Sequence, residues 1–266
     1  MKARIRVGVT GALGRMGQET VKAVFNDPEL QLVGVADPKG RGTKLAEVIS
    51  VPGLDLPVYR DAAEMIDNCS PEVVVDFTTP HTVYDNARTI LTLGATAVIG
   101  TTGLSEQELQ QLEILAREKN TGIAVIPNFA IGAVLMMKFA QEAAKYFSHV
   151  EIIELHHDQK LDAPSGTAVK TAEMINEALA GIPPRAVQET IKVPGCRGGV
   201  LESVRIHSVR LPGLVAHQEV IFGGPGQALT IRHDSYNRES FMPGVLLAVK
   251  KMAGQKGMVY GLENLL

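Results

Sequence analysis

The chain has 266 residues, a formal net charge of −3 and a hydrophobic share of 45%. That length allows two domains with well-buried cores, and the slight negative charge argues against general nucleic-acid binding. No apolar run approaches the roughly 18–20 residues of a membrane span, and the N-terminus lacks a signal-peptide pattern. We therefore expect a soluble cytoplasmic protein that binds neither nucleic acid nor membrane.

The cysteines and histidines give no sign of a disulfide framework or a metal centre. Cys69 and Cys196 stand far apart, without the spacing of any known motif. We expect both thiols to be reduced. No group of histidines and cysteines has the spacing of a zinc site, so no metal is predicted.

The first notable segment, RIRVGVTGALGRMGQETVKAVF at residues 4–25, predicts a strand, a glycine-rich turn and a helix. Its glycines follow the pattern Gly-x-x-Gly-x-x-Gly, one residue longer before the second glycine than the usual dinucleotide-binding motif. Glycines there allow a tight turn and let a pyrophosphate approach the helix N-terminus. The residues expected to face inward are Ile5, Val7 and Val9 in the strand, and Val21, Val24 and Phe25 in the helix.

A second strand, LQLVGVAD at residues 30–37, ends in an acidic residue. Asp37 stands 20 residues beyond Gly17, where a carboxylate can bind the adenosine ribose hydroxyls. Asp37 alone favours NADH, because a carboxylate repels a 2′-phosphate. Lys39 and Arg41 follow it, however, and can clasp that phosphate, so the sequence leaves the choice between NADH and NADPH open.

Strands and helices alternate over the rest of the N-terminal half. Apolar strands are predicted at 71–77, 96–100 and 122–129, with helices between them at 78–94 and 105–122. This succession of βα units predicts a parallel, doubly wound sheet, whose ligand-binding loops lie at the carboxyl ends of the strands.

The ends of the two helices carry recognisable capping residues. Thr79 is predicted to cap the first helix, with Pro80 at its first position and Gly94 beyond its end. Ser105 and Glu108 are predicted to form a capping box at the start of the second.

Three strand ends carry residues suited to a nucleotide, at 77–80, 100–103 and 127–129. Small hydroxylated residues there can bond ribose, phosphate or the nicotinamide amide, and Phe129 can pack against the nicotinamide ring. For the stretch GTTG at 100–103, an ordinary loop with a helix cap is an equally good interpretation.

The pattern changes after residue 130, where a long helix leads into longer strands. The predicted elements are a helix at 132–147, a strand at 149–157, a helix opening near Pro164 or Ser165, strand stretches at 200–211, 214–224 and 227–235, and a helix at 238–252. Glycine and proline mark the turns between the strand stretches. An open sheet of this kind has a broad exposed face, which invites oligomerisation.

The fold class predicted is α/β, with two domains. A Rossmann-like parallel-sheet domain is expected from residues 1–130 together with 239–266, since the last helix docks back on it. A C-terminal α+β domain with an open mixed sheet is expected from residues 131–238.

The segment ELHHDQKLDAPSGTA at residues 154–168 gathers the groups that most suggest chemistry. Two histidines, His156 and His157, end a strand, and Lys160 follows them. Ser165 opens a helix whose first turn offers backbone N–H groups, hydroxyls and a glycine that permits close approach, so it can hold an anion. Each feature alone is more often structural; together they predict a cationic pocket for a carboxylate-bearing substrate that also receives a proton.

These motifs resemble those of the 4-hydroxy-tetrahydrodipicolinate reductase family, formerly called dihydrodipicolinate reductases. The resemblance is carried by GVTGALGRMG, GTTG, PNF and above all ELHHDQKLDAPSGTA, and it spans essentially the whole chain. Ala130 stands where the family often has serine, and Asp37 where glutamate is common. The resemblance implies an NAD(P)H-dependent oxidoreductase of the diaminopimelate route to lysine, assembled as a homotetramer through its C-terminal sheets.

The resemblance also implies a substrate and site residues. The substrate is a cyclic imine with two carboxylates, which loses water, takes up hydride at C4 and is then protonated. His156 is implied as proton donor and acceptor and Lys160 as a second donor. Substrate contacts fall to His157, Ser165, Gly166 and Thr167, with Arg238 as a further carboxylate clamp or, equally, a partner in a surface salt bridge. The cofactor residues, for NADPH or NADH, are Gly11, Ala12, Leu13, Gly14, Arg15, Met16, Asp37, Lys39, Gly100, Thr101, Thr102, Ile126, Pro127, Asn128 and Phe129.

Two other hypotheses remain. One is a different two-domain reductase, such as an amino-acid or sugar dehydrogenase, which would lack the combination of His-His-x-x-Lys with Pro-Ser-Gly-Thr. The other is a nucleotide-sensing module without catalysis, against which the presence of His156 and Lys160 argues.

Overall fold

The computed structural model describes residues 3–40, 42–49, 51–180 and 188–266. It divides into two compact units. Unit 1 comprises Met1–Phe129 and Phe241–Leu266, and unit 2 comprises Ala130–Ser240. Unit 1 is therefore built from two separate parts of the chain.

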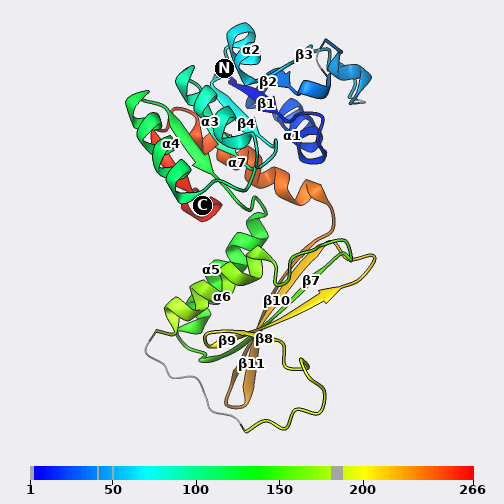
Figure 1. Ribbon diagram of the computed structural model, residues 1–266, viewed down its shortest axis with the longest axis vertical. Helices are drawn as coiled ribbons and strands as arrows, with labels where there is room; N and C mark the ends of the chain where they lie inside the picture. The colour runs from blue at the N-terminus through cyan, green and yellow to red at the C-terminus, as the bar shows by residue number, and fades with distance from the viewer. Residues whose placement is uncertain (1–2, 41, 50, 181–187) are drawn as a thin grey trace. The chain divides into compact units, whose positions relative to one another are not determined.

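Unit 1 is built around a sheet of seven strands in the order β12-β6-β5-β4-β1-β2-β3, and every pairing within it is parallel (Figure 1). The strands are β1 (Ile5–Thr10), β2 (Leu30–Ala36), β3 (Val58–Tyr59), β4 (Val73–Asp76), β5 (Thr96–Ile99), β6 (Gly122–Val125) and β12 (Gly257–Tyr260). The strands β4, β5 and β6 are buried along their whole length, which is why their sequences are continuous apolar runs. The predicted parallel, doubly wound sheet is confirmed.

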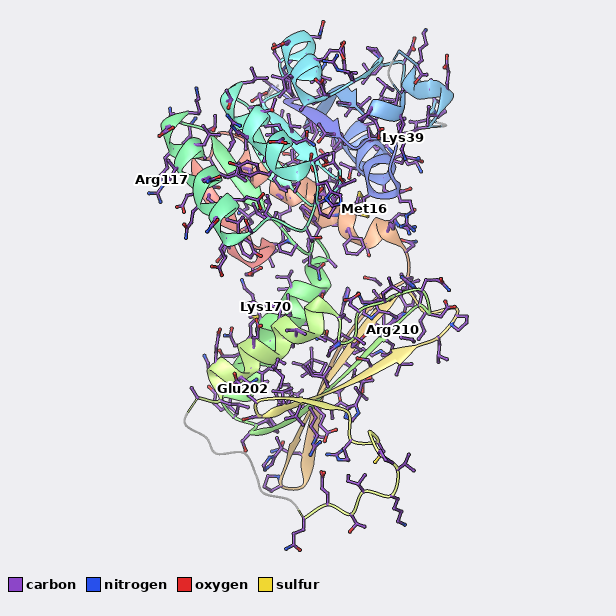
Figure 2. The ribbon with its side chains drawn as sticks, in the orientation of Figure 1. Met16, Lys39, Arg117, Lys170, Glu202 and Arg210 are labelled. Carbon is purple, nitrogen blue, oxygen red and sulfur yellow. The ribbon has the colours of Figure 1, made fainter. Side chains whose placement is uncertain are left out.

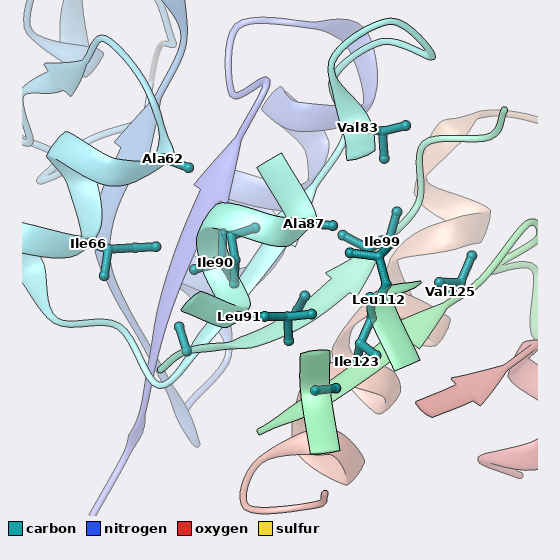
Figure 3. Packing of buried hydrophobic residues seen from close by; sticks show 14 of the residues in the cluster. Ala62, Ile66, Val83, Ala87, Ile90, Leu91, Ile99, Leu112, Ile123 and Val125 are labelled. Carbon is teal, nitrogen blue, oxygen red and sulfur yellow. The ribbon is translucent and has the colours of Figure 1, made fainter. Parts of the chain in front are cut away.

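Helices cover the sheet of unit 1 in two layers, as a parallel sheet requires. One layer holds α2 (Ala62–Cys69), α3 (Val83–Thr92) and α4 (Glu106–Glu118), and the other holds α1 (Arg15–Asn26) and α7 (Met242–Met252). Buried residues such as Ile90 of α3, Ile99 of β5 and Leu112 of α4 form the core between the first layer and the sheet (Figure 3).

The start of α3 differs from the prediction. The helix begins at Val83 with Thr82 at its N-cap, and not at Pro80 behind a Thr79 cap. The Thr79 carbonyl accepts hydrogen bonds from the N–H groups of Thr82 and Val83, both at 3.0 Å, so these residues form a turn ahead of the helix. The capping box of Ser105 with Glu108 at the start of α4 is confirmed.

One prediction for unit 1 was wrong, and some of its elements were not predicted. Phe25 is 37% exposed, because the stripe of α1 that faces the sheet is centred on Val21 and Val24 and Phe25 lies at its edge. The short strand β3, the helix α2 and the edge strand β12 were not anticipated. Short 3₁₀ turns occur at Pro38–Gly40, Leu45–Glu47, Arg238–Phe241 and Leu262–Asn264.

Unit 2 contains a sheet of five strands in the order β11-β10-β7-β9-β8. The strands are β7 (His149–His156), β8 (Gly199–Leu201), β9 (Val204–Arg210), β10 (Ala216–Gly224) and β11 (Gln227–Ser235). β7 and β9 run parallel, whereas the other neighbours are antiparallel, so the predicted mixed sheet is confirmed. The stretch at 200–211 proves to be parts of two strands, which turn at Glu202 with a φ of +53°.

Two helices, α5 (Ile131–Ala144) and α6 (Gly166–Ala178), pack beside each other on one side of this sheet (Figure 1). Because side chains alternate along a strand, Ile152, Glu154 and His156 of β7 point to this helix-facing side. Glu151 and Ile153 point to the other side, which we call the open side. No helix of the described residues covers the open side, and none in the described ranges is long and apolar enough to span a bilayer.

Candidate active site

The strand β7 brings His156 to the point where α6 begins. β7 ends at His156, and α6 starts at Gly166 after a connecting segment of residues 157–165. Ser165 is the N-cap of the helix, and its hydroxyl accepts a hydrogen bond from the N–H of Ala168 at 3.2 Å. The predicted strand end at the histidines and the predicted helix start are both confirmed.

A buried carboxylate joins these two elements. Glu154 lies two residues before His156, so the two side chains point to the same side of the sheet. The Glu154 side chain is 0% exposed, and its Oε2 lies 2.5 Å from Nδ1 of His156. Its other oxygen, Oε1, accepts a hydrogen bond from the backbone N–H of Ser165 at 3.2 Å. One carboxylate therefore holds both the imidazole and the N-cap of α6.

Arg210, at the end of β9, completes this arrangement (Figure 2). Its Nη1 donates to Oε2 of Glu154 at 2.8 Å and its Nη2 donates to Oε1 at 2.7 Å, a bidentate pair. Nη2 also donates to the carbonyl oxygen of Asp162 at 2.7 Å. Arg210 thus neutralises the carboxylate and fastens the connecting segment to the sheet. We call Glu154, Arg210 and His156 the inner cluster.

The environment of the inner cluster shifts the pKa of both titratable partners. Burial works to raise the pKa of Glu154, but hydrogen bonds from Arg210, Ser208 and His156 outweigh it, and the pKa falls below its ordinary value. The pKa of His156 is also lowered. Desolvation is the largest cause, the hydrogen bond to Glu154 opposes it, and the positive charges of Lys160 and Arg210 add to it. His156 therefore releases a proton more readily than an exposed histidine.

Lys160 lies on the connecting segment in an ion pair. Its Nζ is 2.7 and 2.8 Å from the two carboxylate oxygens of Asp162, whose side chain is 62% exposed. The hydrogen bond from Lys160 is the largest cause of the lowered pKa of Asp162. A ligand carboxylate that binds Lys160 must share or replace this exposed partner.

The mouth of α6 offers room for an anion. The first turn of an α-helix presents backbone N–H groups that have no partner within the helix. Gly166 is exposed there, and a Cβ added to it would meet nothing within 4 Å. Thr167 is half-buried beside it, and His157 is exposed on the connecting segment. Open space therefore surrounds Gly166, and a carboxylate can approach the helix mouth at this position.

Arg238 is not tied to this group. It is exposed at the start of a 3₁₀ turn, and among the described residues no side-chain bond connects it to the inner cluster or to Lys160. Within the described ranges, no group of three or more His, Cys, Asp and Glu residues is placed to hold a metal ion.

In unit 1, the turn between β1 and α1 has a backbone that only glycine allows. Gly11 has a φ of +71°, and an added Cβ would overlap the carbonyl of Phe77. A Cβ on Gly17 would overlap the carbonyl of Gly11 in the same way. The helix starts at Arg15, and in the described part of the chain no side chain caps its N-terminus, so the first-turn N–H groups can receive an anion.

Asp37 supports this turn from the end of β2. The side chain is buried; Oδ2 accepts a hydrogen bond from the N–H of Leu13 at 3.1 Å and Oδ1 accepts one from the N–H of Lys39 at 3.0 Å. Each oxygen has further lone pairs that can accept a ribose hydroxyl. Lys39 and Arg15 are exposed, whereas Ala12 is buried and Met16 is half-buried. Arg41 lies outside the described residues.

A second buried carboxylate organises the carboxyl ends of the central strands. Asp76, at the end of β4, is 0% exposed. Its Oδ1 accepts from the hydroxyl of Thr101 at 2.7 Å and from the N–H and hydroxyl of Thr78 at 3.1 and 2.8 Å. Its Oδ2 accepts from the hydroxyl of Thr10 at 2.7 Å and the amide of Asn86 at 3.0 Å. The loops after β1, β4 and β5 are therefore held by one group.

The aromatic residues at this edge are packed against each other. The rings of Phe77 and Phe129 have centroids 5.6 Å apart, and Phe129 is buried whereas Phe77 is half-buried. A Cβ on Gly100 would overlap the Phe77 ring, so the glycine permits this contact. Of the remaining predicted residues, Thr102 and Pro127 are exposed, Asn128 is half-buried and Ile126 is buried. Phe77 is therefore the ring with more surface left for a ligand.

Sequence reasoning missed Glu154, Arg210 and Asp76. A signal for Glu154 existed, because a charged residue two positions before a strand-end histidine lies on the same face of the strand. Asp76 also ends an apolar strand. No local signal pointed to Arg210, whose contact depends on the pairing of β7 with β9.

Comparisons with known proteins agree with these features. A family model described as dihydrodipicolinate reductase, N-terminus, matches residues 5–129, and one described as dihydrodipicolinate reductase, C-terminus, matches residues 132–266. The 4-hydroxy-tetrahydrodipicolinate reductase of Syntrophomonas wolfei is 61% identical over 266 residues and covers 100% of both chains. That of Listeria monocytogenes is 54% identical over 262 residues, covering 98% of this chain and 100% of its own.

Solved structures give the same picture. A dipicolinate-bound dihydrodipicolinate reductase from Paenisporosarcina sp. TG-14 has a TM-score of 0.89 and 49% identity, covering 99% of this chain and 100% of that one. GenD2 from gentamicin A biosynthesis, in complex with NAD, has a TM-score of 0.66 at 17% identity, covering 100% of this chain and 91% of that one; at this identity the likeness concerns the fold alone. The chain therefore belongs to the dihydrodipicolinate reductase family of oxidoreductases.

Proposed function

We propose that the protein reduces 4-hydroxy-tetrahydrodipicolinate to tetrahydrodipicolinate with NADPH or NADH. This step belongs to the diaminopimelate route to lysine in the cytoplasm. The observation that carries the proposal is the bond from one buried carboxylate, Glu154, to both His156 and the N-cap of α6. It fixes a proton donor beside an anion-binding helix start, in a chain 61% identical to a reductase of that name.

The substrate is a dianion, and unit 2 offers groups of matching charge. Ser165, Gly166 and Thr167 at the start of α6 hold one carboxylate through backbone N–H and hydroxyl groups. Lys160 and His157 bind the substrate from the connecting segment. The Lys160–Asp162 ion pair is exposed on the Asp162 side, so breaking it costs little free energy. Arg238, which is exposed, is a further candidate to bind a carboxylate of the substrate.

The chemical sequence needs one hydride and one proton. Loss of the 4-hydroxyl as water leaves a conjugated ring, which takes up hydride at C4, and the resulting enamine is protonated. His156 gives that proton through Nε2, since Nδ1 is bound to Glu154. Lys160 is the second donor, and its positive charge favours release of the proton from His156.

Unit 1 has residues that fit a dinucleotide. The glycine turn leaves space for a pyrophosphate at the start of α1, where no side chain caps the N–H groups. Gly11 to Met16 would hold the pyrophosphate, Asp37 the adenosine ribose, and the loops at Gly100–Thr102 and Ile126–Phe129 the nicotinamide end. When bound, the reduced nucleotide would supply the hydride.

The preference between NADH and NADPH depends on Asp37 and Lys39, whose effects on the two nucleotides are opposite. Asp37→Ala should weaken NADH binding more than NADPH binding, because the ribose hydroxyls lose an acceptor. Lys39→Ala should do the reverse, because a 2′-phosphate loses a cation. Dissociation constants for both nucleotides, measured by fluorescence titration, check this; an unchanged ratio in both variants would move selectivity to Arg15 or Arg41.

We also propose a homotetramer joined through the open side of the sheet of unit 2. Ile153 and Leu155 of β7 are only half-buried on that side, where no helix of the described residues lies. Light scattering on the wild type and on Ile153→Glu tests this; a monomeric wild type would refute it.

The direct test of activity is an assay of nucleotide oxidation. The purified protein should oxidise NADPH or NADH only when the cyclic imine is supplied, with release of one equivalent of tetrahydrodipicolinate per nucleotide. Oxidation that does not depend on the imine, or that proceeds equally with an amino acid or sugar substrate, would point instead to another two-domain reductase.

A further inference from the structure

We propose that Glu154 and Arg210 are positioning residues that set the tautomer of His156 and the pH range in which it donates its proton. The inference rests on the proposed function, since it concerns the residue that acts as donor there. It adds roles for two residues that lie outside the proposed substrate contacts.

The tautomer follows from the hydrogen bonds of the carboxylate. Both oxygens of Glu154 accept from Arg210, and the charged carboxylate has no proton to give. The 2.5 Å contact between Oε2 and Nδ1 of His156 therefore requires a proton on Nδ1. The neutral imidazole is then the Nδ1–H form, and Nε2 is the nitrogen that carries and releases the transferable proton.

The charge of Arg210 is needed as well. A buried carboxylate alone would favour the protonated imidazole and hold its proton tightly. Arg210 shares both oxygens of Glu154, so the carboxylate orients the ring while much of its negative charge is balanced. The lowered pKa of His156, with desolvation first and Arg210 among the lowering charges, agrees with this balance.

The charged groups around His156 are few. Glu154 lies on its own strand, Arg210 on β9, and Lys160 on the connecting segment. On β10 the paired residue is Ala216, which has no charge, and α6 contributes its uncharged N-cap, Ser165. Asp162 binds Lys160 with its carboxylate and Arg210 with its carbonyl.

The same strand supplies a matched control. On the open side, Glu151 lies 2.5 Å from Nη2 of Arg197 and 2.8 Å from Nε2 of His207. We call Glu151, Arg197 and His207 the outer cluster. It has the same three residue types, but Glu151 is 36% exposed and lies on the open side, outside the proposed catalytic machinery and within the proposed subunit interface. Glu151→Gln therefore repeats the chemical change of Glu154→Gln away from the catalytic groups, and light scattering checks that this variant keeps the oligomeric state of the wild type.

The experiment is the pH profile of kcat/KM for the cyclic imine with NADPH, in Glu154→Gln, Arg210→Met, Arg210→Lys and Glu151→Gln. Activity falls with rising pH as the donor loses its proton. Glu154→Gln should move this alkaline limb to lower pH, because the group that favours protonated His156 is lost. Arg210→Met should move it to higher pH, because Glu154 then acts on His156 without its balancing cation.

Two further readouts separate positioning from general damage. Glu154→Gln should lower kcat by roughly 10- to 100-fold with little change in KM, less than the about 10²–10⁴-fold that a positioned acid contributes. Arg210→Lys keeps the charge, so its limb should lie between those of the wild type and Arg210→Met. Glu151→Gln should keep the wild-type profile.

The result that overturns the inference is an alkaline limb that stays in place, or moves in the same direction, in Glu154→Gln and Arg210→Met. If either variant does not fold, the other variant and Arg210→Lys still test the inference. A shift of the alkaline limb opposite to the direction stated for any of them refutes the proposed balance between Glu154 and Arg210. Failure of the proposed function would look different: the wild type would then oxidise NADPH at the same rate with and without the cyclic imine, so no imine-dependent pH profile would exist in any variant.

Discussion

Strand β7 carries two Glu–Arg–His clusters, one on each side of the same sheet. The inner cluster is centred on Glu154, which is 0% exposed, and the outer cluster on Glu151, which is 36% exposed. In both, the arginine is bidentate and a ring nitrogen of the histidine donates to the same carboxylate. The three positions that separate the two glutamates place them on opposite sides of the strand.

The difference in burial changes what each cluster can do. In the inner cluster, desolvation is expensive, and the carboxylate is tolerated because Arg210, His156 and the Ser165 N–H all donate to it. In the outer cluster of a single subunit, water screens the charges, and each pair contributes little. The pKa of Glu151 is also lowered, since bonds from Arg197 and His207 outweigh the raising effect of burial. Only the inner cluster combines a fixed imidazole with a helix N-terminus.

The largest expected difference concerns turnover. His156→Gln should lower kcat by about 10²–10⁴-fold, because a positioned proton donor is lost, while KM changes less since the helix mouth and Lys160 remain. His207→Gln, the matching change in the outer cluster, should leave kcat as in the wild type. Steady-state kinetics with the cyclic imine measures kcat and KM for both variants. Equal turnover in the two variants would mean that the inner and outer clusters do not differ in function.

The second-largest expected difference between the clusters is in their contribution to the free energy of unfolding. Glu154→Ala should cost about 3–5 kcal/mol of unfolding free energy, because it leaves Arg210 without its partner in a mostly buried position. Glu151→Ala should cost roughly 0.2–1 kcal/mol, as is usual for exposed pairs. Urea unfolding followed by circular dichroism gives both values; similar losses would mean that burial does not set the strength of these clusters.

The inner cluster should also make stability depend on pH. The pKa of Glu154 is lowered in the folded protein, so its contribution is full above the ordinary carboxyl value of 4.5 and is lost as the pH falls below it. The pKa of His156 is lowered too, so folding is favoured above 6.5 and weakened as the pH falls through that value. The stability gap between wild type and Glu154→Gln should shrink below about pH 4.5. A gap that widens in acid would contradict the sign of the Glu154 shift.

Salt should produce the smallest difference. The cost of Arg197→Met, at most about 1 kcal/mol, should fall as sodium chloride is raised, since exposed charges are screened over about 10 Å at 0.1 M. The cost of Arg210→Met should change much less, because its partner is fully buried. Unfolding free energies at low and high salt make this comparison, and an equal salt dependence would indicate that water reaches both clusters.

Much of the molecule was predictable from local pattern. The continuous apolar runs of β4, β5 and β6 indicated a parallel sheet, and the capping box at Ser105 fixed the start of α4. The strand end at His156 and the cap at Ser165 were predicted in the same way, because each depends on neighbours in sequence.

What the sequence did not reveal depends on contacts between distant residues. Arg210 is 56 positions from Glu154, and the two meet only because β9 pairs in parallel with β7, with Arg210 opposite His156. Asp76 gathers donors from segments that the sheet brings together. The helix start predicted at Pro80 was three residues too early, since residues 80–82 form a turn ahead of Val83.

The central claim has two parts that can be measured directly: the buried Glu154 carboxylate holds His156 as the Nδ1–H tautomer, and desolvation together with the charges of Lys160 and Arg210 lowers the pKa of His156. Nitrogen-15 NMR of histidine-labelled protein, with the His156 signals assigned by their loss in His156→Gln, reports both the tautomer and the titration. The account predicts a protonated Nδ1 and an unprotonated Nε2 at pH 8, and a titration midpoint below the ordinary 6.5. A neutral ring protonated at Nε2, or a midpoint above 6.5, would contradict it.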